Sequence, residues 1–141
     1  MRVFIDANIL VAVLNKEYPL FSNSARILSL NGKKNFQLFT SPLCLAIAFY
    51  FSSKKSGAQK AKRKIDMLIQ NIGVTTIDES AVLNAVHNKK IHDFEDGLEY
   101  YSAINHSCDY IITEDINDFY FTEIEVVNSE KFLFEIATCY I

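Results

Sequence analysis

Short apolar segments alternate with segments of helical periodicity along this chain, and the alternation restricts its fold more than any other feature. Strands are expected over Arg2–Ile5 and over residues 36–41, 73–77, 109–113 and 124–128. Helices are expected over residues 8–15, 21–34, 42–53, 58–70, 79–90, 92–107 and 130–137. Parallel strands need long crossover connections, which helices supply. The sequence therefore predicts a three-layer α/β/α fold around a mainly parallel sheet of about five strands.

Length and composition agree with a single domain over residues 1–141. Half of the 141 residues are hydrophobic, and 4 Gly and 2 Pro leave little linker-like sequence. An acid at the sixth position argues against a signal peptide, and no apolar run is long enough to span a bilayer. Cys44, Cys108 and Cys139 are scattered without C-x-x-C spacing, which favours reduced thiols in a cytoplasm over a disulfide framework or a zinc site.

Two of the expected helices differ in polarity. The helix over residues 42–53 starts with Pro42 and is apolar nearly all round, which predicts a central position. The helix over residues 58–70 carries a cluster of basic residues opposite its apolar face: Lys60, Lys62, Arg63 and Lys64. The net charge of −3 argues mildly against nucleic-acid binding through the overall field. The basic cluster is therefore either a solvated face or a local contact for the phosphates of a single-stranded substrate or for an acidic partner.

Acidic residues follow two of the expected strands. Asp6 ends the first strand, and Asp115 and Asp118 come directly after the fourth. Ligands of open parallel sheets bind outside the carboxyl ends of the strands. If these two strands are neighbours, about 4.8 Å apart, their terminal carboxylates face one cleft. A third group, Asp93 to Asp96, begins the helix that leads back into the fourth strand, so Asp96 is expected at the same edge of the sheet.

Two interpretations of these acids stay open. Asp93 suits a helix N-cap with an acid three residues later, and the other acids suit solvated loops. Clustered carboxylates repel one another unless a cation is present, and their oxygens suit Mg²⁺ or Mn²⁺. Two such ions activate water and stabilise the leaving oxygen in phosphodiester cleavage. No Ser/His/Asp or Cys/His constellation competes, since His87, His92 and His106 lack metal-ligand spacing.

Two segments carry a resemblance to a known family. "VFIDANIL" near the start and "HDFEDGLEYYSAINHSCDYIITEDINDF" late in the chain resemble the PIN-domain family, in particular a bacterial VapC-type branch with a "DFEDALQYYSA…CDYIIT" pattern. The first motif is weak, whereas the second is long and specific, and the resemblance covers nearly the whole chain. It implies a parallel sheet covered by helices and a metal-dependent ribonuclease activity, often that of the toxin in a toxin–antitoxin pair.

The resemblance also assigns site residues. It implies catalytic roles for Asp6, Asp96, Asp115 and Asp118, of which the first three would bind Mg²⁺ or Mn²⁺, and supporting roles for Asn8, Thr113 and Asp93. Many active members carry a glutamate where this chain has Ile47, and the surrounding helix contains no acid. Two functions are therefore open: an active endoribonuclease, or a catalytically degenerate PIN-fold interaction module.

The partners implied are an RNA substrate held by the basic helix, an antitoxin that inserts a basic side chain into the acidic cleft, and a second copy of the chain. The segments "YFSSKK" and "FLFEIATCYI" are apolar enough to contribute to a dimer interface. A third class, a phosphatase or response-regulator domain, fits poorly. Such a phosphatase would need an aspartate where Asn8 stands, and a receiver would need paired acids before its phosphorylated aspartate and a late lysine.

Overall fold

A parallel sheet forms the centre of the protein, which is described by a computed structural model over residues 1–140; Ile141, the last residue of the expected domain and of the C-terminal apolar segment, lies outside the described residues. Within residues 1–140 the sheet has five strands: β1 (Arg2–Ile5), β2 (Gln37–Thr40), β3 (Gly73–Val74), β4 (Tyr110–Ile112) and β5 (Glu125–Val127). Their order is β3-β2-β1-β4-β5, and every pairing is parallel. The predicted α/β fold is confirmed.

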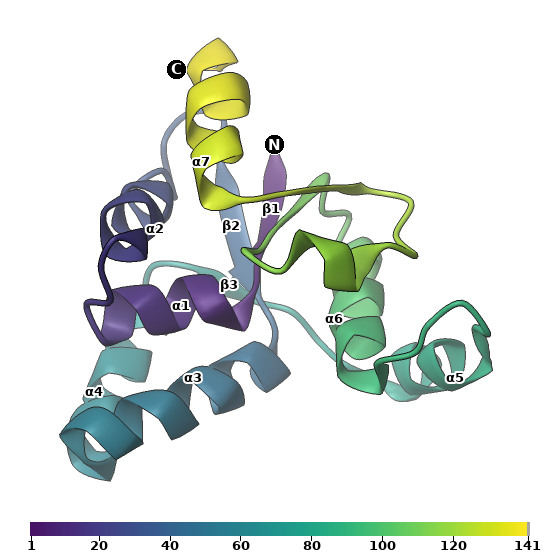
Figure 1. Ribbon diagram of the computed structural model, residues 1–141, viewed down its shortest axis with the longest axis horizontal. Coiled ribbons are helices and arrows are strands. Elements are labelled where there is room, and N and C mark those ends of the chain that lie inside the picture. The colour runs from purple at the N-terminus through teal and green to yellow at the C-terminus, as the bar shows by residue number, and fades with distance from the viewer. Residues whose placement is uncertain (141) are drawn as a thin grey trace.

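Helices connect all the strands except β4 and β5, which a 3₁₀ helix joins. The connecting helices are α1 (Ala7–Leu14), α2 (Leu20–Leu28), α3 (Pro42–Ser56), α4 (Ala58–Ile69), α5 (Glu79–His87) and α6 (Phe94–Asn105), and the 3₁₀ helix before β5 is Ile116–Phe119. After β5 come α7 (Ser129–Lys131), a π-helical segment at Phe132–Ile136 and a 3₁₀ turn at Ala137–Cys139. In Figure 1, α1, α2 and α4 lie to the left of the strands and α5 and α6 to the right, while α3 runs beside α1. Two sets of helices thus enclose the strands.

The core centres on the two middle strands. Val3, Phe4 and Ile5 of β1 and Ile111 and Ile112 of β4 are fully buried. A parallel sheet covered on both faces requires such continuous apolar strands. Burial of each of these side chains contributes about 1.5–3 kcal/mol. The edge of the sheet where β1 and β4 end is therefore firmly fixed, and it carries the acids.

The expected central position of the helix over residues 42–53 was wrong. The buried residues of α3 are Cys44, Ala48 and Ser52, which recur every four residues on one face. Tyr50 and Phe51 on the outer side are about half exposed, at 52% and 47%. Apolar character alone did not place this helix, because α3 packs through one stripe against α1 and α4 and leaves Tyr50 and Phe51 largely exposed.

No helix within residues 1–140 combines the length and the apolar character needed to cross a membrane. The three cysteines are free thiols, with Cys44 and Cys108 buried and Cys139 exposed, in agreement with the predicted absence of a disulfide framework.

Candidate active site

The site begins where β1 and β4 end side by side. Ile5 is in register with Ile112, which confirms that the first and fourth strands are neighbours. The chain continues from β1 into Asp6, whose backbone N–H donates to the Ile112 carbonyl at 3.0 Å. Asp6 is 8% exposed and caps α1, since its Oδ1 accepts from the Ala7 N–H at 2.6 Å. The cap fixes the carboxylate at the carboxyl edge of the sheet.

A hydrogen-bond network links Asp6 to Asp115. The Thr113 hydroxyl donates to Asp6 Oδ2 at 2.7 Å, and Thr113 Oγ1 accepts from the Asp115 N–H at 3.0 Å. Asn8 Nδ2 donates to Thr113 Oγ1 at 3.0 Å and to Asp115 Oδ2 at 3.1 Å. Asn8 and Thr113 thus orient both carboxylates, which is the geometry expected of supporting residues. The threonine acts from the end of β4 and the asparagine from the first turn of α1.

A pocket of about 480 Å³ opens over this network and collects acids from several elements. Its acidic lining residues are Asp6, Glu17, Asp93, Glu95, Asp96, Glu99, Asp115 and Asp118. Within the described chain, the lining of this pocket contains no Lys, Arg or His. The four aspartates predicted as catalytic are therefore all brought together, in a pocket whose charge attracts cations.

The acids at the start of α6 fit both interpretations given above, a helix cap and a metal site. Asp93 Oδ1 accepts from the N–H groups of Glu95 and Asp96, at 2.9 and 3.3 Å, so Asp93 is the N-cap and also lines the pocket. Asp96 is half-buried behind it. Burial, followed by the negative charges of Asp93 and Asp6, raises the pKa of Asp96 to about 7. A carboxyl group with this pKa is about half ionised at neutral pH, and a nearby cation would favour its ionised form.

Sequence reasoning missed Glu99, one turn beyond Asp96. Glu99 is 2% exposed, and within residues 1–140 its Oε2 atom has no hydrogen-bond partner. Burial, followed by the charge of Asp6, raises the pKa of Glu99 to about 10. A signal was present: Glu99 lies three residues after Asp96 and four before Ala103, which is fully buried, so helical spacing put it on the inward stripe.

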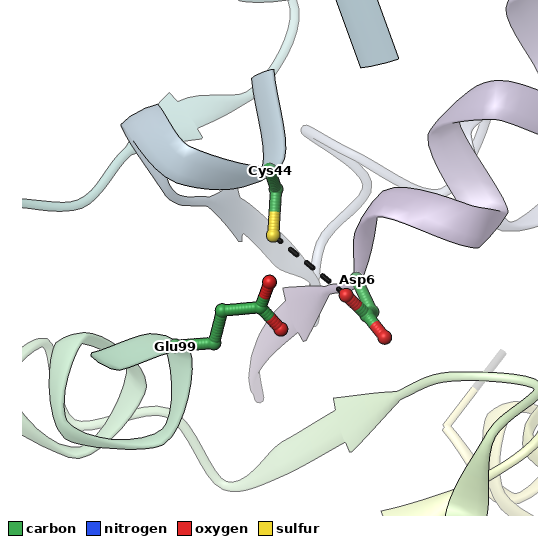
Figure 2. A group of neighbouring side chains, drawn as sticks. All are labelled: Asp6, Cys44 and Glu99. Atoms are coloured by element: carbon green, nitrogen blue, oxygen red, sulfur yellow. Dashed lines mark hydrogen bonds between the residues drawn. The ribbon is translucent and has the colours of Figure 1, made fainter. Parts of the chain in front are cut away.

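Cys44 completes a buried group with Asp6 and Glu99. Its Sγ lies 3.8 Å from Asp6 Oδ1, within reach of a weak S–H hydrogen bond. One donor atom from each of the three residues lies within 4.8 Å of the others. Figure 2 shows the three side chains converging from the start of α3, the end of β1 and the middle of α6. Burial, then the charges of Glu99 and Asp6, raises the pKa of the Cys44 thiol.

Ile47 and Glu114 bear on the missing glutamate. Ile47 lines the pocket, so the position where a glutamate was expected does face the site. Glu114 does not replace it, because its Oε1 accepts hydrogen bonds from the Ser129 N–H, at 3.1 Å, and from the Ser129 hydroxyl. The additional carboxylate in the pocket comes from Glu99 instead, and the donor set of several carboxylates suits a divalent cation.

Removal of the Thr113 hydroxyl is expected to weaken cation binding. In Thr113→Val, Asp6 Oδ2 loses its 2.7 Å donor and the Asp115 N–H loses its acceptor. Loss of such an orienting group typically costs about 10–100-fold in metal affinity. Calorimetric titration of the EDTA-stripped variant with Mn²⁺ measures the loss. Thr113→Ser keeps the hydroxyl and serves as the control; equal affinities of the valine and serine variants would contradict a positioning role.

Comparison with known proteins agrees with the fold. The model of the PIN domain family matches residues 2–117. Ribonuclease VapC1 of Aquifex aeolicus is 26% identical over 135 residues, covering 93% of this chain and 92% of that protein. A toxin–antitoxin complex from Klebsiella pneumoniae contains a chain that is 16% identical with a TM-score of 0.68, and the match covers 90% of this chain and 97% of that one.

A second solved structure extends the likeness. It is VapC20 of Mycobacterium tuberculosis, a toxin that cleaves the sarcin–ricin loop, which is 14% identical with a TM-score of 0.66 over 86% of this chain and 98% of that one. At such identities the structural likeness concerns the fold. The family model, however, spans both acidic ends of β1 and β4 together with the start of α6. The chain is therefore a member of the PIN domain family.

Proposed function

We propose that the protein is a metal-dependent endoribonuclease and the toxin of a toxin–antitoxin pair. The observation that carries the proposal is the pocket, in which eight carboxyl side chains from the described residues meet without a basic one. Protons on Asp96 and Glu99, whose pKa values are raised, relieve only part of the negative charge of this pocket, and bound cations would neutralise the rest. The location that goes with this function is the cytoplasm.

Three of the relatives support this choice. The Aquifex aeolicus protein is named a ribonuclease, the Mycobacterium tuberculosis toxin cleaves an RNA loop, and the Klebsiella pneumoniae structure is a toxin–antitoxin complex. By this likeness the substrate is RNA and the inhibitory partner is an antitoxin. An antitoxin with a basic side chain would complement the acidic pocket directly.

The residues divide by role. Asp6, Asp96 and Asp115 would hold Mg²⁺ or Mn²⁺, with Asp118 as a further ligand or an orienting group, and Asp93 would hold the start of α6 in place through its cap. When bound, such an ion activates water and stabilises the leaving oxygen of the phosphodiester. Asn8 and Thr113 keep the carboxylates of Asp6 and Asp115 oriented.

The RNA backbone would contact α4 through its exposed basic residues Lys60, Lys62 and Arg63. Lys64 differs from them, because its ammonium group donates to the Leu14 carbonyl at 2.8 Å and to the Ser56 hydroxyl at 3.3 Å. It therefore ties α4 to the rest of the fold. We assign the contact with RNA to the other three.

Neutralisation of the α4 cations is expected to weaken RNA binding without changing the chemical step. The triple variant Lys60→Ala/Lys62→Ala/Arg63→Ala should lower the salt dependence of RNA affinity, with the slope of log affinity against log salt falling by roughly 0.7 for each lost phosphate contact. Fluorescence anisotropy with a labelled single strand measures it. Lys33→Ala/Lys34→Ala, an exposed basic pair outside α4, is the matched control. If the salt dependence of RNA affinity were the same in the two variants, α4 would not be part of the RNA-binding surface.

The second candidate function is that of an interaction module that has lost catalytic activity. Ile47 faces the pocket without a carboxylate, and this observation favours a PIN fold that now serves only as an interaction module. Exposed aromatic residues are present for such a role, among them Tyr50, Phe51 and Phe134, and they lie in the two segments that were expected to contribute to a dimer. Glu99 speaks for the active enzyme, because it restores a carboxylate to the pocket.

Metal binding and cleavage measured on the same samples test the proposal. EDTA-stripped protein is titrated with Mn²⁺ by calorimetry and assayed on a fluorescent single-stranded RNA, beside Asp96→Asn. Saturable binding with Mn²⁺-dependent cleavage, both lost in Asp96→Asn, is the expected result. Binding of neither Mn²⁺ nor Mg²⁺ by the wild type would overturn the nuclease and favour the interaction module.

A further inference from the structure

We propose that Asp6, Cys44 and Glu99 form an inner metal site on the floor of the pocket, suited to a borderline divalent cation such as Zn²⁺ or Co²⁺. This inference rests in part on the proposed function, because Asp6 would be a metal ligand in both. It concerns a metal–sulfur bond, however, and does not require that the protein cleave RNA. Mg²⁺, in contrast, would be confined to the oxygen ligands of the outer pocket.

The spacing of the three donors fits one ion. Their ligand atoms lie within 4.8 Å of one another, and all three residues are buried. Zinc bonds of about 2.3 Å to sulfur and about 2.0–2.2 Å to oxygen place the ligand atoms of a tetrahedral ion about 3.4–3.6 Å apart. The 3.8 Å between Cys44 Sγ and Asp6 Oδ1 is close to this value, and the Glu99 carboxylate would move inward to reach it. A small adjustment of side chains therefore closes the site. The side chains already point toward a common centre (Figure 2).

Glu99 supplies the independent indication of a ligand. Its side chain is 2% exposed, it is aimed at Asp6 and Cys44, and Oε2 has no hydrogen-bond partner among the described residues. Buried polar atoms are almost always paired, and a lone buried carboxylate is costly unless it is neutralised or coordinates a metal. A cation bound between Glu99 and Asp6 satisfies this oxygen.

The two oxygens of Asp6 serve different sides of the site. Oδ2 accepts from the Thr113 hydroxyl at 2.7 Å, on the side of Asp115. Oδ1 lies 3.8 Å from Cys44 Sγ and accepts from the Ala7 N–H, which leaves a lone pair for a metal. Asp6 therefore offers one oxygen to the outer acids and one to the inner site, as a bridging carboxylate does.

The sulfur sets the preference of the inner site. Thiolate is a soft ligand that selects zinc-like ions over Mg²⁺ and Ca²⁺. Binding forms a metal–sulfur bond at Cys44 and a metal–oxygen bond at Glu99, and the thiol proton and the proton that Glu99 holds in the metal-free protein both leave to solvent. Asp6 and Glu99 line the open pocket while Cys44 is buried beside them, so an ion entering from the pocket meets the carboxylates first.

Cobalt spectroscopy tests the site directly, because Co²⁺ bound to thiolate absorbs through charge transfer in the near ultraviolet. EDTA-stripped protein is titrated with CoCl₂. The wild type, Cys139→Ser and Cys108→Ala are expected to show a saturable band, and Cys44→Ser to show none. Glu99→Gln, which retains the sulfur, should lower the Co²⁺ affinity at least about tenfold. Circular dichroism verifies the fold, and if Cys44→Ser is unfolded, Glu99→Gln alone decides.

Several outcomes separate this inference from the nuclease. A band that persists in Cys44→Ser but vanishes in Cys139→Ser would reveal a surface thiol and overturn the inner site. No band in wild-type protein that cleaves RNA with Mn²⁺ would also overturn it, while leaving the nuclease standing. A Cys44-dependent band in protein that never cleaves RNA would support the inner site and count against the nuclease.

Discussion

Replacement of Asp6 with asparagine is expected to lower metal-dependent RNA cleavage more than about 100-fold, beyond the effect typical of removing an orienting group. Asp6 is the most connected acid of the site: it caps α1, accepts from Thr113, and borders both Cys44 and Glu99. Asparagine keeps the cap, because its side-chain oxygen accepts as well as that of aspartate. The fold should survive while the negative charge shared by the metal ligands is lost.

A comparison with a surface acid isolates this effect. Asp66→Asn changes an exposed carboxylate on α4 and should leave cleavage and Mn²⁺ affinity unchanged. Single-turnover cleavage of labelled RNA and calorimetric Mn²⁺ titration are measured for both variants. Wild-type cleavage by Asp6→Asn at saturating Mn²⁺ would rule out a mechanism that depends on this carboxylate.

Glu99→Gln is expected to stabilise the metal-free protein at alkaline pH. The pKa of Glu99 is raised to about 10 in the folded protein from an ordinary 4.5. Between these values the native state keeps a proton that the unfolded chain releases, so the free energy of unfolding falls as pH rises, by up to about 1.4 kcal/mol per pH unit. This contribution is fully present below pH 4.5 and is lost as pH rises through the folded pKa. Glutamine is neutral and similar in shape, so the variant escapes that loss.

Urea unfolding in EDTA at pH 5 and pH 8 measures the difference, which should amount to several kcal/mol at pH 8 and shrink toward pH 5. Glu79→Gln, an exposed acid on α5, is the control and should change stability by less than about 0.5 kcal/mol. Added Co²⁺ should narrow the difference between the two proteins, by about 1.4 kcal/mol for each tenfold difference in Co²⁺ affinity, because the wild type offers a ligand that the variant lacks. A variant less stable than wild type in EDTA at pH 8 would contradict a protonated, buried Glu99.

The periodicity of the sequence was sufficient to predict the sheet and the position of Asp6, Asp96, Asp115 and Asp118 at its edge. The strand β1 appears where three consecutive apolar residues precede Asp6, and the parallel register then sets Asp6 beside Thr113. Asp96 followed from topology, since a helix that returns to β4 must start at the carboxyl edge. These features depend on periodicity and connectivity, which a sequence displays directly.

Tertiary packing decided the features that sequence reasoning missed. The burial of Glu99 and its proximity to Cys44 depend on how closely α3 and α6 approach β1. The periodicity of a sequence does not reveal the distance between two helices. The last expected helix, over residues 130–137, is instead split into α7, a π-helical segment and a 3₁₀ turn. Its Phe132 packs between Phe36 and Tyr110, with ring centroids 6.3 and 6.0 Å away, contacts that no local propensity contains.

The hydrogen bond from Asn8 to Asp115 joins residues 107 positions apart, and this separation has a consequence during synthesis. At about 5–20 residues per second, a ribosome needs roughly 5–20 s to travel from one partner to the other. Throughout that interval the emerging chain carries Asp6 without Thr113 and Asp115 to complete the site. On the proposed mechanism, the nascent chain would be unable to attack RNA, including that of the ribosome making it, until nearly the whole chain has emerged and β4 has joined β1.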